Sequence, residues 1–247
     1  MPQGRLTREK GIQYHQSNVE IASLIASHFA WGRRDIILSK SWELLRRMDL
    51  EPGSFLQNAS ALEWRRLEGF VHRTFKDSDV LWMLGKWSAY LIEHGSLQGM
   101  FRGATVKDGL HCYASLMKDG LQPGDRIRKH FASPAQGSAC KRMNMLLRWM
   151  LRSDECGVDL GLWKIHSMSD LHLPLDVHST TTAMALGLLP ANAKPNWNAV
   201  ERLGIEARQI CPDDPALLDF ALFGLGEEAF RSGFPLLDFL ERTLKGE

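Results

Sequence analysis

The chain has 247 residues, of which 44% are hydrophobic and 24% are charged, and its formal net charge is +1. This composition is ordinary for a globular protein, and the near-neutral charge carries no global signature of nucleic-acid binding. No apolar run approaches the roughly 18–20 residues that a membrane helix needs. Residues 1–10 contain charges but no apolar core, so we expect no signal peptide and no contact with a membrane.

Four cysteines are scattered along the chain without a Cys-x-x-Cys pair. They are Cys112, Cys140, Cys156 and Cys211. Their spacing argues against a zinc ribbon and against a disulfide framework. We therefore expect reduced thiols and a protein of the cytoplasm.

Charge is concentrated in residues 125–152. This segment holds seven Lys and Arg residues against one acid, a local charge of +6, so the rest of the chain carries −5. A confined basic face is typical of a surface that binds a phosphate backbone. A solvated helix face gives the same pattern, and the charge count alone does not decide between the two.

Helical periodicity and capping signals dominate the chain from Asn18 onward. The expected helices cover residues 18–31, 35–48, 60–71, 77–94, 105–118, 125–132, 139–152, 176–187, 196–211, 217–225 and 235–244. Residues 1–17 lack periodicity and predict an extended arm or a short capping segment. Residues 158–163 alternate and are the only place where we expect some extended structure. The predicted class is all-α, with about ten helices joined by short loops.

For two of these helices the sequence also predicts how the first turn is capped. In the helix of residues 35–48, Asp35 is placed to cap the first turn. Its predicted apolar face consists of Ile37, Leu38, Trp42, Leu45 and Met48. The segment Ser60-Ala61-Leu62-Glu63 has the capping-box pattern and is expected to open a helix that continues to Val71.

Residues 137–147 combine a tight turn with an amphipathic helix that has Lys141 on its first turn. A second segment, Leu173-Pro174-Leu175-Asp176-Val177-His178, places a carboxylate at another helix start. A lysine and an aspartate delivered by two helix starts can form a nucleophile site. They can also be a solvated lysine and a simple N-cap, which stabilises a helix by about 1 kcal/mol.

These segments resemble the helix-hairpin-helix DNA glycosylase superfamily. Gly137-x-Ala139-x-Lys141 is similar to its hairpin, in which a lysine early in the second helix is the catalytic nucleophile. Pro174-Leu175-Asp176-Val177-His178 is similar to its Pro-Val-Asp-x-His segment, whose aspartate is the second catalytic residue. Residues 25–35 and 198–224 are similar to its opening and closing helices, so the resemblance covers about residues 18–226.

Two branches look nearest. The chain as a whole is similar to a bacterial family of unassigned activity that carries Gly-Ser-Ala-Cys-Lys-Arg and Pro-Leu-Asp-Val-His. Among characterised enzymes it is similar to the archaeal 8-oxoguanine (GO) glycosylases, which also have a long gap between the lysine and the aspartate. In this chain the gap runs from Lys141 to Asp176.

The resemblance implies a bifunctional DNA N-glycosylase and AP lyase, acting as a monomer in the nucleoid on duplex DNA that contains an oxidised purine such as 8-oxoguanine. It implies two helical lobes with a cleft between them, one of residues 60–175 with the hairpin at 133–139, the other of residues 18–59 and 176–247. No cofactor or metal is expected. The late four-cysteine loop that binds an iron–sulfur cluster in some members is missing, because Cys211 is the only late cysteine.

The resemblance also implies roles for further residues. The DNA contacts are expected at Gly137, Ser138, Ala139, Arg142, Arg148 and His178, with the amides of Ala139 and Cys140 pointing at a phosphate. The extruded base is expected to contact Asp219, Phe223, Trp31 and Phe70. For the three aromatic residues, core packing is the competing interpretation. Asp219 lies among apolar neighbours, and a carboxylate in such a place needs a partner.

One departure from the family pattern concerns the hairpin, which reads Ser133-Pro134-Ala135-Gln136-Gly137-Ser138-Ala139 and keeps only one glycine. Close approach of its backbone to a phosphate is therefore less assured. Four alternatives stay open: a non-catalytic DNA-binding protein of the same fold, an interaction module with no nucleic-acid ligand, a metal site of His172, Asp176 and His178, and a nucleophilic Cys140 thiol.

Overall fold

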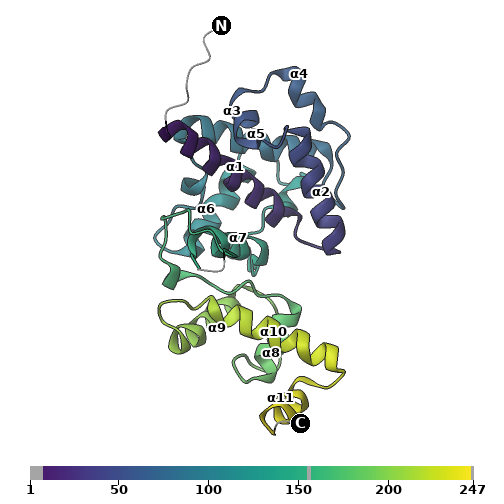
Figure 1. Ribbon diagram of the computed structural model, residues 1–247, viewed down its shortest axis with the longest axis vertical. Coiled ribbons are helices and arrows are strands. Elements are labelled where there is room, and N and C mark those ends of the chain that lie inside the picture. The colour runs from purple at the N-terminus through teal and green to yellow at the C-terminus, as the bar shows by residue number, and fades with distance from the viewer. Residues whose placement is uncertain (1–7, 155–156, 246–247) are drawn as a thin grey trace. The chain divides into compact units, whose positions relative to one another are not determined.

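The computed structural model describes residues 8–154 and 157–245. Within these residues all regular elements are helices, and β-structure is limited to isolated bridges (Figure 1). This confirms the predicted all-α class. None of the described helices combines the length and the apolar character needed to cross a membrane. The chain divides into two compact units, one of residues 1–103 and 112–131 and one of residues 104–111 and 132–247, called unit 1 and unit 2 below.

Unit 1 is built on α1. Its elements are α1 (Arg8–Phe29), α2 (Arg34–Arg47), α3 (Pro52–Asn58), α4 (Ala61–Trp64), η1 (Arg65–Leu67), α5 (Asp77–His94), η2 (Gln98–Phe101) and η3 (Arg126–His130). Helix α6 (Val106–Lys118) belongs to this unit from Cys112 onward. The stripe Ile21, Leu24, Ile25 and Phe29 is fully buried, and α1 packs against α2 and α3. The periodicity read from residues 18–29 is therefore the core face of α1.

Four predictions for unit 1 are wrong. Helix α1 begins at Arg8, so residues 8–17 of the expected arm are helical, while residues 1–7 lie outside the described residues. Arg33, not Asp35, occupies the N-cap position of α2. Leu38 and Trp42 are each 50% exposed, and the buried side of α2 consists of Ser41 and Leu44, with Met48 just after the helix. The Ser60–Glu63 capping box forms, but α4 ends after one turn.

Unit 2 carries the segments singled out in the sequence. Its elements are the first turns of α6, η4 (Pro134–Gln136), α7 (Lys141–Leu151), η5 (Met168–Asp170), α8 (Val177–Ala185), α9 (Trp197–Ile210), α10 (Leu217–Ser232) and α11 (Leu236–Lys245). Helix α10 packs on α8 and on α11. At the crossing of α8 and α10, Gly226 has no side chain to meet Thr182, whose Oγ1 would lie 2.7 Å from an added Cβ.

The last carbonyl groups of α7 accept hydrogen bonds from the segment that follows the helix. Leu160 N donates to Trp149 O at 2.6 Å, and Trp163 N donates to Met150 O at 2.7 Å. These bonds satisfy carbonyls that a helix C-terminus leaves without an intrahelical partner. The extended structure expected at residues 158–163 is limited to one isolated bridge, between Ser153 and Leu160.

Helix α10 is longer than predicted, because it continues beyond Leu225 to Ser232. The starts of α8 and α9 are confirmed, with the side chains of Asp176 and Asn196 as their caps. The boundaries of units 1 and 2 differ from those of the expected lobes, residues 60–175 and residues 18–59 with 176–247. The lobe assignment, which rests on the resemblance, stays a prediction.

Candidate active site

The hairpin of residues 133–140 is a short 3-10 turn followed by two left-handed residues. Ser133 accepts a hydrogen bond from Ala135 N at 3.3 Å, which starts the turn η4. Gly137 then has φ +75° and Cys140 has φ +48°, after which α7 begins. The single glycine kept in this hairpin thus stands where a left-handed backbone is needed. An added Cβ at Gly137 would meet nothing within 4 Å, so the requirement is conformational and not one of space.

Most hairpin amides are used inside the protein. Gly137 N donates to Pro134 O, Ser138 N to Ser133 O, and Cys140 N to Ser138 Oγ at 3.1 Å. The predicted phosphate contact through the Cys140 amide therefore competes with an existing hydrogen bond. Lys141 is the first residue of α7, so it stands at the positive end of this helix.

The hairpin is fixed to its neighbours in unit 2 by three contacts. Trp197 N, at the start of α9, donates to Gly137 O at 3.0 Å. Asn144 Nδ2 donates to Ala139 O at 3.0 Å from within α7. Ser133 Oγ lies 3.0 Å from His111 Nδ1. These contacts set the direction in which α7 leaves the turn, and with it the place of Lys141.

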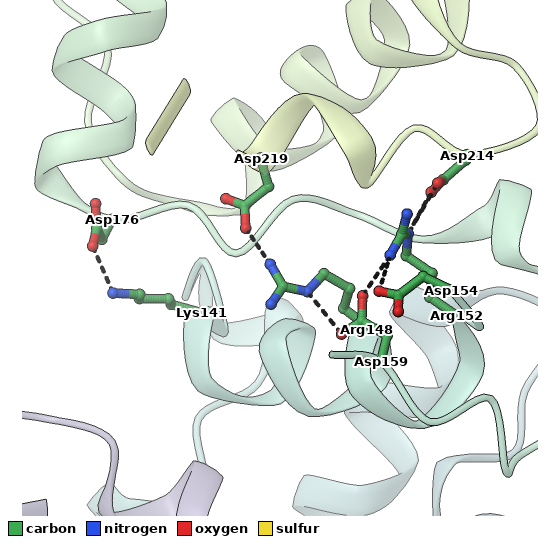
Figure 2. Close-up of polar contacts among 8 residues, drawn as sticks. All are labelled: Lys141, Arg148, Arg152, Asp154, Asp159, Asp176, Asp214 and Asp219. Atoms are coloured by element: carbon green, nitrogen blue, oxygen red, sulfur yellow. Dashed lines mark hydrogen bonds and ion pairs between the residues drawn. The ribbon is translucent and has the colours of Figure 1, made fainter. Parts of the chain in front are cut away.

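Lys141 and Asp176 form an ion pair (Figure 2). Lys141 Nζ lies 2.5 Å from Asp176 Oδ2, and the side chains are 41% and 24% exposed. Asp176 Oδ1 accepts a hydrogen bond from Ser179 N at 2.8 Å, so the same carboxylate caps α8. Burial acts to raise the pKa of Asp176, but the hydrogen bonds from Lys141 and Ser179 outweigh it and lower the pKa below its ordinary value. The aspartate therefore stays ionised beside the lysine.

Asp219, on the first turn of α10, has the partner that its burial requires. Arg148 donates from Nη1 to Asp219 Oδ2 at 2.6 Å (Figure 2). Burial raises the pKa of Asp219 to about 6, while Arg148 and Lys141 act to lower it and Asp176 acts to raise it. Since Lys141 and Asp176 both influence this carboxyl, the three groups share one electrostatic environment.

Arg148 and Arg152 join Asp219 to further acids in what we call the aspartate–arginine cluster. It consists of Arg148, Arg152, Asp154, Asp159, Asp214 and Asp219 (Figure 2). Asp159 is the innermost member, with a fully buried side chain that lies 2.9 Å from Arg152 Nη1 and 3.4 Å from Arg148 Nε. Phe220 lies under both guanidinium groups, 4.5 Å from that of Arg148 and 5.3 Å from that of Arg152.

A cavity of about 410 Å³ opens between α8, α10 and α11. It is lined by His178, Ser179, Thr181, Thr182, Leu222, Phe223, Gly226, Glu227, Ala229, Phe230, Phe234 and Leu236. His178 and Ser179 stand on the first turn of α8, directly after Asp176. Phe223 is one helical turn beyond Asp219 on α10, so the two side chains share a helix face.

Two of the predicted base-binding residues, Phe70 and Trp31, lie in unit 1. Phe70 is fully buried, with its ring stacked on Phe29 at a centroid distance of 5.6 Å. Trp31 is partly exposed, and the Arg73 guanidinium covers its ring at 4.3 Å. Phe70 is thus a core residue of unit 1, which is the competing interpretation given for it above.

Four of the seven Lys and Arg residues in the segment 125–152 form ion pairs with acids. Arg126 pairs with Asp79, Lys141 pairs with Asp176, and Arg148 and Arg152 belong to the aspartate–arginine cluster. Arg148, predicted to contact DNA, is instead only 11% exposed and engaged within unit 2. The count of +6 therefore overstates the positive charge that this segment presents to a ligand.

The metal interpretation gains no support. Among the described residues no group of three His, Cys, Asp or Glu side chains is arranged to hold a metal ion. His172 packs edge-on against Trp197 with ring centroids 5.2 Å apart, and Asp176 is committed to Lys141 and Ser179.

Sequence reasoning missed Asp159 and Asp214, and it missed the contribution of α11 to the cavity. A signal for the first two was present. Arg148, in the last turn of α7, and Arg152, its C-cap residue, are both buried, and a buried arginine requires an acid nearby. The acids after α7 and before α10, Asp154, Asp159 and Asp214, were the available partners.

Comparison with known proteins places the chain in a family without assigning it a reaction. No curated protein matches it, and no solved structure matches it. A family model described as "Protein of unknown function (DUF2400)" matches residues 11–228, a span that includes the hairpin, the Lys141–Asp176 pair and Asp219. The chain belongs to this DUF2400 family.

Proposed function

We propose that this protein is a DNA glycosylase with AP lyase activity that removes an oxidised purine, foremost 8-oxoguanine, from duplex DNA. One observation carries the proposal. Lys141 Nζ and Asp176 Oδ2, 35 positions apart in the chain, lie 2.5 Å from each other at the starts of α7 and α8. The resemblance described above assigns the nucleophile and the second catalytic carboxylate to these two residues.

Base release requires a nucleophile at the sugar carbon that bears the base. Asp176 is the nearest acceptor for a proton of Lys141, and the neutral amine then attacks C1′. The glycosidic bond breaks, and the base leaves with the bonding electrons and takes up a proton. Once Asp176 has passed the proton from Lys141 to the departing base it is ionised again, and it stabilises the positive charge that develops on the sugar.

Strand cleavage follows from the same intermediate. The lysine nitrogen and C1′ form a Schiff base, with the sugar ring opened and its ring oxygen protonated. Loss of a proton from C2′ then expels the 3′-phosphate as the C3′–O bond breaks. Asp176, or the released base, is placed to take the C2′ proton.

The choice of an oxidised purine as substrate rests on two residues of α10, Asp219 and Phe223. A base must leave the duplex before it can be cleaved, and it then needs an aromatic surface and a polar reader. Phe223 lines the cavity between α8, α10 and α11, and Asp219 lies one turn away on the same helix. 8-Oxoguanine carries an N7–H donor that guanine lacks, and a carboxylate such as Asp219 accepts from it.

Borohydride trapping on a duplex that contains 8-oxoguanine tests the proposal. Wild-type protein is expected to form a covalent adduct with the lesion strand, and Lys141→Gln is expected to form none. Lys86→Gln is the matched control, because Lys86 also pairs with an aspartate, Asp119, at 3.3 Å but has no assigned role. An adduct that survives Lys141→Gln, or no adduct with wild type on any oxidised purine, excludes this mechanism.

The same experiment separates the alternative function. A non-catalytic DNA-binding protein would shift the duplex in a salt-dependent manner without adduct or base release, and Asp176→Asn would leave that binding unchanged.

A further inference from the structure

Asp219 is largely buried and forms an ion pair with Arg148. Its carboxylate is buried, and Arg148 Nη1 lies 2.6 Å from its Oδ2. Arg148 comes from α7 and Asp219 from α10, which are 71 positions apart in the chain. The contact therefore fixes the wall of the site relative to the helix that carries Lys141.

The orientation of Arg148 is set by three separate contacts. Its Nη1 donates to Asp219, its Nε lies 3.4 Å from the fully buried Asp159 carboxylate, and its guanidinium lies 4.5 Å from the Phe220 ring centroid. Phe220 is the neighbour of Asp219 on α10. A guanidinium is planar and donates in fixed directions, so the hydrogen bond to Asp219 and the Phe220 ring restrict its plane. Asp159 acts on Arg148 as a nearby charge, because Arg148 Nε makes no hydrogen bond to it.

Arg152 serves a different set of acids. It pairs with Asp154, Asp159 and Asp214, each at 2.9 Å. Arg152 and Arg148 thus share Asp159, but the ion pair with Asp219 is made by Arg148. This division supplies a matched comparison between Arg148, in the last turn of α7, and Arg152, its C-cap residue.

We propose that Arg148 is a positioning residue that acts through Asp219, holding its carboxylate ionised and in place beside the Lys141–Asp176 pair. The part of this inference that concerns base reading rests on the proposed function. An ionised carboxylate accepts hydrogen bonds at both oxygens, whereas a neutral carboxyl must donate one. Arg148 therefore determines whether the site reads an N–H donor such as N7–H of an oxidised guanine.

The charges that face Asp219 account for this dependence. Arg148 and Lys141, both on α7, favour the carboxylate, while Asp176, before α8, opposes it. Burial raises the pKa of Asp219 to about 6 even with Arg148 present. Removal of the nearest opposite charge is expected to raise the pKa further, by about 1–3 pH units, so that the neutral form becomes a substantial or dominant fraction of Asp219 at pH 7.

Carbon-13 NMR titration of aspartate carboxyls in the protein without DNA tests the proposal. Asp219 is identified as the resonance missing from Asp219→Asn. Wild type is expected to titrate near pH 6, Arg148→Gln higher by about 1–3 pH units, and Arg148→Lys in between. Arg152→Lys, the matched control, is expected to titrate with wild type.

Two results overturn the proposal. One is an unchanged Asp219 titration in folded Arg148→Gln. The other is a shift in Arg152→Lys as large as that in Arg148→Lys, and this comparison decides if Arg148→Gln does not fold. These readouts need no DNA, so they remain valid if borohydride trapping fails.

The pH profile of base release tests the link to function. In wild type its acid limb is expected near pH 6, the pKa of Asp219, and in Arg148→Lys it is expected to move upward together with the NMR titration. A profile that stays in place while the titration moves refutes the positioning role and leaves the proposed glycosylase activity intact.

Discussion

Lys141 Nζ and Asp176 Oδ2 lie 2.5 Å apart, and each belongs to a residue that starts a helix. The Asp176 carboxylate is divided between two tasks, since Oδ2 binds Lys141 and Oδ1 caps α8 through Ser179 N. One carboxylate thus fixes the first turn of α8 and the charge of the site at the same time. Substitutions that remove only one of these tasks can separate them.

Asp176→Asn is expected to keep α8 capped and to abolish most base release. Asparagine caps helices as well as aspartate does, so its amide oxygen can still accept from Ser179 N. It carries no charge, so it neither stabilises a cationic sugar nor takes a proton, and single-turnover base release should fall by about 100- to 10,000-fold. Asp176→Ala should show the same loss of rate and also destabilise the fold by about 1 kcal/mol.

Urea unfolding and single-turnover assays of both variants give the comparison. If Asp176→Asn retains the wild-type rate, the carboxylate is only a helix cap and the catalytic assignment falls.

Gly137→Ala is expected to weaken DNA binding at a modest cost in stability. Gly137 has φ +75° and open space around an added Cβ, so alanine introduces backbone strain of about 1–2 kcal/mol and no clash. The strain falls on the hairpin that leads into Lys141. Gly187→Ala is the control, because Gly187 also has φ +75° and open space but follows α8.

Both glycine variants should lose similar stability in urea unfolding, and only Gly137→Ala should lose affinity for duplex DNA in titrations at fixed salt. Equal affinities for the two variants would contradict a role of the hairpin in DNA binding.

Local signals predicted some helix starts correctly and missed others, such as those of α1 and α2. Asp176 and Asn196 cap the helices that the sequence assigned to them, because a cap depends on residues three positions apart. In α2, by contrast, periodicity located an apolar stripe, but the side that found a partner consists of Ser41 and Leu44. Which face is covered depends on the neighbouring helix, and a single segment carries no information about its neighbour.

In the candidate site, too, residues in local motifs could be predicted, whereas an ion pair between distant residues could not. The resemblance selected Lys141 and Asp176, and the fold brings them together. Arg148 was counted as a DNA contact because it lies in a basic segment, yet its partner Asp219 is 71 positions away. Charge counting along the chain cannot include a counter-ion that only the fold supplies.

Helix α10 continues past its glycines because of tertiary contact, and this leads to a prediction about Gly226. Alanine at this position places Cβ 2.7 Å from Thr182 Oγ1 and should cost about 1–3 kcal/mol through overpacking. In Gly226→Ala/Thr182→Ala the clash is gone, so the double variant should be more stable than the two single effects predict, by about 0.5–3 kcal/mol.

Gly224→Ala is the matched control on the same helix. Its added Cβ would meet nothing within 4 Å, so alanine should stabilise α10 by about 0.5–1 kcal/mol. Urea unfolding of the four variants measures these free energies. Additive effects of Gly226→Ala and Thr182→Ala would mean that α8 and α10 do not meet at this point.

His172 is expected to make the protein sensitive to acid. Burial, and secondarily Arg208, lower the pKa of His172 from 6.5 to about 4, so the ring stays neutral against Trp197 in the folded state. Between these two pH values the unfolded chain binds the proton and the folded protein does not. The free energy of unfolding must therefore fall as the pH drops through this window, by about 3 kcal/mol in total.

His172→Gln removes this titration, so its unfolding free energy should vary less between pH 7 and pH 4 than that of wild type, by about 3 kcal/mol. His178→Gln is the control, because His178 is exposed on the first turn of α8 and its substitution should leave the acid sensitivity in place. Urea unfolding at several pH values measures both. If His172→Gln is as sensitive to acid as wild type, the folded protein protonates the His172 ring in place against Trp197. The pKa of His172 is then not lowered by folding.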